Sequence, residues 1–146
     1  ESGVARNLMD YGVSLGRRFR ALKLWFVIRQ FGTEGIAANI RRHISYAAKL
    51  EQWIRDSKDF EVLAPRHFSV VVFRYHPPGV DDEAKLEAIN TRILDAVNAS
   101  GEIFLSHTKT KGRYAIRVAI GNLRTTESHV LKAWELLKNA NNLVEV

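Results

Sequence analysis

Apolar side chains recur at helical spacing, every third or fourth residue, in four stretches of the chain. Each stretch begins at a serine, threonine or aspartate, and these residues cap helix N-termini well. We therefore expect helices over residues 14–31 and 33–57, between Asp81 or Asp82 and Ser100, and from Thr125 onward. Ser14 is the expected cap of the first helix, and Gly32 is expected to end it.

β-Branched and aromatic residues between these helices predict strands. The expected strands are residues 60–63, 69–75, 103–108 and 113–120, with the last two forming a hairpin across residues 109–112. The order α-α-β-β-α-β-β-α predicts an α+β fold: a mostly antiparallel four-stranded sheet with its helices on one face, preceded by two long helices.

The last expected strand has two different faces. Tyr114 and Ile116 alternate with Ala115 and Arg117, so the large apolar residues point towards the helices and the small residues and Arg117 point away. A lone arginine between small residues indicates a face that offers a guanidinium group to an anion. The alternative is a solvated arginine on an open sheet.

The first expected helix is apolar on nearly every side over residues 21–28. A helix of that kind has to be buried all round, and the rest of the chain is too small to cover it. The sequence begins at Glu1 rather than Met and has no signal-peptide pattern, and its longest apolar run is too short to span a bilayer. We interpret the chain as a soluble part of a longer protein.

Composition narrows the class of protein. Of the 146 residues, 46% are hydrophobic and 26% are charged, which excludes disordered and low-complexity chains. The absence of cysteine excludes disulfides, thiolate zinc sites and cysteine nucleophiles, and we expect a cytoplasmic location. The net charge is +6, and the stretch between Tyr11 and Thr33 has five basic residues and no acidic one. Such a stripe is typical of contacts with nucleic acid, an anionic ligand or an acidic partner.

One local pattern favours an anion site. Residues 14–18 (Ser-Leu-Gly-Arg-Arg) lie where the first helix is expected to begin, and free N–H groups at a helix N-terminus bind anions. Gly16 has no side chain to block a phosphate group. The alternative is an ordinary capped helix with solvated arginines.

Other kinds of site have little support. The five histidines form no i,i+4 pair, so we expect no metal site, and residues 81–83 are interpreted as a helix cap. Phosphate loops and the nucleophile elbow are absent from the sequence, and we assign no catalytic residue.

Residues 15–29 (LGRRFRALKLWFVIR) resemble a signature of the group II pyridoxal-phosphate-dependent decarboxylases, in the branch similar to aromatic-L-amino-acid decarboxylase. The resemblance continues in residues 40–43, 114–119 and 125–130. It implies a PLP-dependent transferase-type enzyme, in which residues 1–31 end the large cofactor domain and form its linking helix. Residues 32–146 would then be the small C-terminal α+β domain.

The resemblance also implies roles for two residues. Gly16 matches a glycine whose backbone approaches the cofactor phosphate of the neighbouring subunit. Arg117 matches an arginine that pairs with a substrate carboxylate in the glutamate-decarboxylating branch. The family's cofactor-binding lysine follows a histidine, and none of the eight lysines here does. The chain is therefore expected to be inactive alone and to bind no pyridoxal phosphate covalently.

The resulting hypothesis is the C-terminal part of a homodimeric, cytoplasmic PLP-dependent carboxy-lyase of amino-acid metabolism. The resemblance implies that the whole enzyme converts an aromatic L-amino acid to an amine and CO₂. This chain would supply part of the dimer interface and the Gly16 phosphate contact in trans, without nucleic acid or membrane partners. Two alternatives stay open: a non-catalytic oligomerisation domain, and a basic α+β domain whose affinity for nucleic acid would fall steeply with salt.

Overall fold

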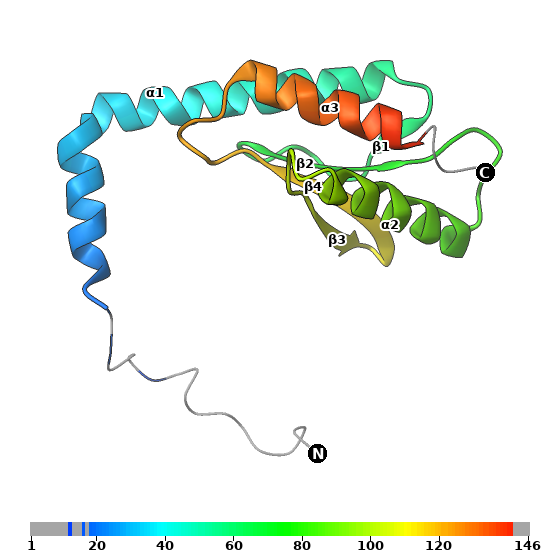
Figure 1. The fold of residues 1–146 in the computed structure, drawn as a ribbon, viewed down its shortest axis with the longest axis horizontal. Coiled ribbons are helices and arrows are strands. Elements are labelled where there is room, and N and C mark those ends of the chain that lie inside the picture. Colours follow the sequence, from blue (N-terminus) through cyan, green and yellow to red (C-terminus); the bar gives the residue numbers. More distant parts are fainter. Residues whose placement is uncertain (1–11, 13–15, 17, 142–146) are drawn as a thin grey trace. The chain divides into compact units, whose positions relative to one another are not determined.

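The computed structural model describes residues 12, 16 and 18–141. The chain divides into two compact units, with the boundary between Ile36 and Ala37. The elements are α1 (Arg20–Asp56), β1 (Phe60–Val62), β2 (Val70–Tyr75), α2 (Glu83–Ala99), β3 (Ser106–Thr110), β4 (Arg113–Ala119) and α3 (Glu127–Asn141) (Figure 1). The predicted element order is confirmed, with the first two expected helices joined in α1.

α1 contains the break that the sequence predicted. Gly32 has φ 65° and ψ 171°, which lie outside the helical region, so helical segments flank it on both sides. The predicted start is wrong: α1 begins at Arg20, because Arg18 and Phe19 have φ of 49° and 43° and cannot continue a right-handed helix. Ser14, the expected cap, lies outside the described residues.

The first part of α1 exposes its apolar side chains. Leu24, Trp25 and Phe26 are 61%, 54% and 58% exposed, although the sequence predicted burial on all sides. The expected burial is therefore not found for these side chains. No helix among them is long and apolar enough to cross a membrane.

The sheet has the strand order β1-β2-β4-β3, and all its pairings are antiparallel. The predicted strand boundaries of the hairpin need correction. Its turn is Lys111-Gly112 alone, with φ of 51° and 79°, so pairing continues to Thr110↔Arg113. Positive φ at both positions is typical of the type I′ turn, whose twist matches that of the two strands. β3 starts only at Ser106, because the amide of Asn98 in α2 binds both the N–H and the C=O of Leu105.

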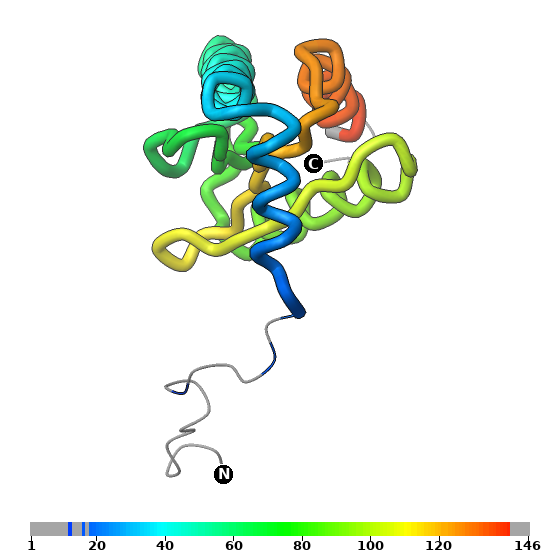
Figure 2. The backbone as a smooth tube through the Cα atoms, turned by 90° about the vertical axis from the view of Figure 1, so that its left-hand side faces the viewer, coloured from blue at the N-terminus to red at the C-terminus, as the bar shows by residue number. Residues whose placement is uncertain are grey.

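The three helices pack on one face of the sheet, as the alternation of strand residues predicted. Val71, Phe73, Ile116 and Val118 point into a core that all three helices share. The helical contributions to this core include Leu50 and Ile54 from α1, Ile89 and Ile93 from α2, and Val130 and Leu137 from α3. Figures 1 and 2 show α3 and the part of α1 from Ala37 onward over the same side of the sheet. The opposite face carries Val72 and Arg117.

An asparagine of α2 completes the hydrogen bonding of β2. In the described structure the β2–β4 pairing ends at Phe73↔Ile116, one residue before Arg74. The side chain of Asn90 then accepts a bond from Tyr75 N at 2.7 Å and donates to Tyr75 O at 2.8 Å. Asn90 therefore takes the place of a strand and fixes α2 against the end of β2.

Candidate functional site

Arg117 lies on the sheet face opposite the helices, as predicted. Its direct cross-strand neighbours are Val72 on β2 and Ser106 on β3. The side chain is exposed, and its Nη1 donates a long hydrogen bond of 3.4 Å to Ser106 Oγ. No carboxylate in the described part of the chain forms a salt bridge with Arg117. The guanidinium group is therefore available for an external anion.

The small residues beside Arg117 differ in exposure. Ala119 is exposed, whereas Ala115 is fully buried, although the sequence placed both on an open face. Ala115 lies opposite Thr108 on β3. The accessible part of this face is therefore the end around Arg117 and Ala119.

Arg74 is a second arginine of this face, and the sequence analysis missed it. Its side chain is only 3% exposed and binds Glu61 of β1 and, at 2.6 Å, Glu83 of α2. Burial alone would lower the pKa of the guanidinium group, but the hydrogen bonds to Glu83 and Glu61 raise it. The same bond lowers the pKa of Glu83. Strand alternation could have placed Arg74 on the face of Arg117, but its carboxylate partners depend on the tertiary fold.

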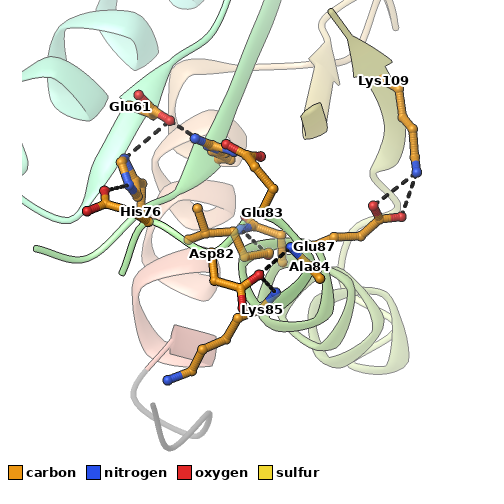
Figure 3. Close-up of polar contacts among 12 residues, drawn as sticks. Glu61, His76, Asp82, Glu83, Ala84, Lys85, Glu87 and Lys109 are labelled. Carbon is orange, nitrogen blue, oxygen red and sulfur yellow. Dashed lines mark hydrogen bonds and ion pairs between the residues drawn. The ribbon is translucent and has the colours of Figure 1, made fainter. Parts of the chain in front are cut away.

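The acidic residues around the start of α2 are used in structural contacts (Figure 3). Asp82 caps the helix by accepting bonds from Ala84 N and Lys85 N, which confirms that interpretation of the acidic run. His76 Nδ1 lies 3.3 Å from Glu61, and Glu87 pairs with Lys109 of β3 at 2.8 Å. These carboxylates neutralise cations and a helix end, and none of them is arranged as an acid–base pair.

Gly16 lies in the segment before α1, four residues ahead of its first residue. The predicted argument from a helix N-terminus therefore does not apply to it, because the free N–H groups belong to the first turn. Gly16 is exposed, and a Cβ atom built on it would meet no atom of the described residues beyond its chain neighbours within 4 Å. Its backbone is accessible to a ligand, and the neighbouring Arg18 is also exposed.

Lysine side chains could attach a cofactor, and acidic and histidine side chains could bind a metal ion. All eight lysine side chains are exposed. Within the part of the chain that the structure describes, three of them pair with carboxylates: Lys49 with Glu127, Lys109 with Glu87 and Lys132 with Glu102. Within residues 18–141 and the two glycines before them, no group of three or more acidic or histidine side chains could hold a metal ion.

Comparison with known proteins identifies the family. Residues 1–76 match the pyridoxal-dependent decarboxylase conserved domain. The chain is 44% identical over 129 residues to phenylacetaldehyde synthase of Arabidopsis thaliana, covering 88% of this chain and 26% of that relative. It is 45% identical over 130 residues to tyrosine decarboxylase 2 of Narcissus pseudonarcissus, covering 89% of this chain and 26% of that relative.

A solved structure shares the fold. The crystal structure of Oryza sativa TDC with PLP and tryptamine superposes with a TM-score of 0.81 at 34% identity, over 94% of this chain and 29% of that one. The chain belongs to the pyridoxal-dependent decarboxylase family, and the resemblance predicted from residues 15–29 is confirmed. It spans about a quarter of the length of the curated relatives it matches.

Proposed function

We propose that this chain is the C-terminal part of a homodimeric, PLP-dependent decarboxylase that converts an aromatic L-amino acid to the corresponding amine and CO₂. In that enzyme, the chain contributes part of the dimer interface, a backbone contact to the cofactor phosphate and one wall of the substrate site. The cytoplasm is its proposed location.

The agreement of three comparisons carries the proposal. The family match coincides with 45% identity to a protein named tyrosine decarboxylase and with a fold shared with a protein crystallised with PLP and tryptamine. Tyrosine and tryptamine are both aromatic compounds, which supports an aromatic substrate for the whole enzyme. The uncovered apolar surface of α1 supports a role in contacts with the rest of that enzyme.

The residues of this chain fit part of the cofactor. Pyridoxal phosphate supplies an electron sink for the decarboxylation when it is bound. The open backbone at Gly16 fits a phosphate oxygen, because within the described residues beyond its chain neighbours no side chain lies within 4 Å of the position where Cβ would be. The family's cofactor-binding lysine follows a histidine, and none of the eight lysines here does, so we assign covalent attachment to none of them. We therefore assign only the phosphate contact to this chain.

Arg117 is the residue that we assign to the substrate. A guanidinium group binds a carboxylate through paired N–H donors, and Arg117 presents most of its donors on an open face. Ser106 holds the side chain from the neighbouring strand. In this role Arg117 orients the substrate and takes no part in proton transfer.

The first experiment expresses the full-length protein and supplies tryptophan, tyrosine and phenylalanine in turn. Release of CO₂ with formation of the aromatic amine is the expected result. One relative is named phenylacetaldehyde synthase, so the assay also measures aldehyde. Aldehyde in place of amine would overturn the proposed product, and the absence of CO₂ with all three substrates would overturn the decarboxylase.

The second experiment tests Gly16. In the full-length protein, Gly16→Trp should weaken the binding of pyridoxal phosphate at least tenfold, because the indole would occupy the space of the phosphate group. Gly121→Trp is the matched control, since its Cβ would also meet no atom within 4 Å. Cofactor affinity that is the same in both variants would remove Gly16 from the site.

The third experiment tests Arg117. Arg117→Gln in the full-length protein should raise KM for the amino acid while leaving cofactor affinity unchanged. Arg92→Gln, which removes another exposed arginine, is the control. An unchanged KM would remove Arg117 from the substrate site without affecting the proposed activity.

A further inference from the structure

A hollow of about 510 Å³ lies between α1 and the segment that follows β1. Its lining residues are Glu51 and Arg55 of α1, Val62 at the end of β1, and the connection from Leu63 to Arg66. None of them belongs to the site proposed above. The volume is within the range of small-molecule sites, about 300–1,000 Å³.

Two arginines of the hollow share one carboxylate. Arg55 donates to Glu51 Oε1 from Nη2 at 2.7 Å, and Arg66 donates to Glu51 Oε2 from Nε at 2.8 Å. The bond from Arg55 is the main cause that lowers the pKa of Glu51, and the bond from Arg66 adds to it against the effect of burial. Glu51 is therefore ionised at neutral pH, and the three side chains together have a charge of +1.

Most N–H donors of Arg55 and Arg66 are not bound to Glu51. A guanidinium group has five N–H donors. Arg55 uses two of its groups, Nε and Nη2, both on Glu51. Arg66 uses Nε on Glu51 and Nη1 on the carbonyl of Phe68. The remaining donors of both residues have no partner in the described part of the chain, so the hollow can accept a second anion.

The loop that holds Arg66 is strained. Phe68 has φ 49° and is 74% exposed, a conformation and a location that are both unfavourable for a phenylalanine. Its carbonyl accepts the bond from Arg66 Nη1 at 3.1 Å, and the turn is closed by Val70 N donating to His67 O. Arg66 is therefore held by two acceptors, the carboxylate of Glu51 and the carbonyl of Phe68.

The remaining lining residues, Val62 to Pro65, are apolar, so the hollow combines a cationic part with an apolar part. We propose that it is a binding site for a small organic carboxylate with an apolar body. The carboxylate group lies on the free donors of Arg55 and Arg66, and the apolar body lies against Val62, Leu63 and Pro65. A planar carboxylate matches the guanidinium fork, and an apolar body gains affinity that an inorganic anion cannot.

The test is a titration of the 146-residue chain with 3-phenylpropionate, followed by calorimetry and by the NMR shifts of residues 62–66. Binding should be saturable in the millimolar range and should weaken with added salt. Inorganic phosphate and 3-phenylpropanol, which each lack one half of the ligand, should bind at least tenfold more weakly. Equal binding of phosphate would reduce the site to a general anion contact and overturn the proposal, as would the absence of saturation.

Arginine variants connect the binding to this hollow. Arg66→Gln and Arg55→Gln should each weaken 3-phenylpropionate at least fivefold, whereas Arg92→Gln on α2 should not. Because Arg66 also holds the Phe68 turn, Arg66→Lys, which keeps the positive charge, is measured beside Arg66→Gln. Circular dichroism reports whether the chain is folded. Binding that is unchanged in folded Arg55→Gln and folded Arg66→Gln would overturn the site. Cofactor binding and decarboxylation by the full-length protein do not depend on the result.

Discussion

The bond between Asn90 and β2 allows the sharpest test of the fold. Asn90 is 1% exposed, and its side chain is the partner of both Tyr75 N and Tyr75 O. Asn90→Ala leaves these two buried backbone groups unpaired, and each such group costs about 1–3 kcal/mol. Loss of the bond from Asn90 Nδ2 to Leu86 O adds little to this cost, because the Leu86 carbonyl also belongs to the hydrogen-bonded backbone of α2. We expect a loss of about 2–6 kcal/mol in the free energy of unfolding.

Asn98 is a matched control on the same helix. It also binds a backbone N–H and a backbone C=O, those of Leu105, at 2.8 Å and 3.0 Å. Asn98 is only half-buried, so water can replace its side chain, and Asn98→Ala should cost about 1–2 kcal/mol.

Urea denaturation followed by circular dichroism measures both variants. With an m-value of about 2 kcal/mol/M, a loss of about 4 kcal/mol moves the midpoint down by about 2 M. The midpoints can be compared in this way only if both variants have the same m-value as the wild type. If Asn90→Ala is no more destabilising than Asn98→Ala, then Asn90 does not replace a strand partner of Tyr75.

Three further predictions concern charge and turn geometry. The lowered pKa of Glu51 means that its stabilisation is present above its unfolded pKa and is lost as the pH falls through the folded one. At pH values below about 5, the urea midpoint should therefore decrease as the pH falls, and it should decrease less steeply in Glu51→Gln. Burial raises the pKa of Tyr114, with a smaller opposing effect from its hydrogen bond to Thr91, so stability should fall above about pH 10. In Tyr114→Phe, tyrosinate absorbance should show one fewer late-titrating tyrosine than in the wild type. Lys111→Asn should stabilise the chain by about 0.5 kcal/mol, because asparagine tolerates the left-handed φ of 51° better than lysine; a lower urea midpoint would contradict the type I′ turn.

Local patterns were sufficient to predict most elements of the fold. Strand alternation placed Ile116 towards the helices and Arg117 away from them, because successive side chains in a strand point to opposite faces. Asp82 and Gly32 were found as a cap and a helix break, because each acts on backbone groups within a few residues of itself. The family signature is likewise a contiguous run of residues.

The start of α1 could not be predicted in the same way. Ser14 has the residue type of a cap, but Arg18 and Phe19 adopt left-handed φ values that neither residue type prefers. Residue type gives a preference for a backbone conformation, and the surroundings of the chain decide whether that preference is followed.

The charged and polar contacts within the fold were decided by tertiary structure. Arg74 meets Glu61 and Glu83, which are 13 and 9 residues away, and Asn90 meets Tyr75 at a separation of 15 residues. The order of the strands, which brings β2 between β1 and β4, is also a property of the whole sheet. Spacing along the chain determines which face of an element a side chain lies on. What faces it there depends on how distant elements pack, because burial and pairing are set by atoms that are neighbours only in space.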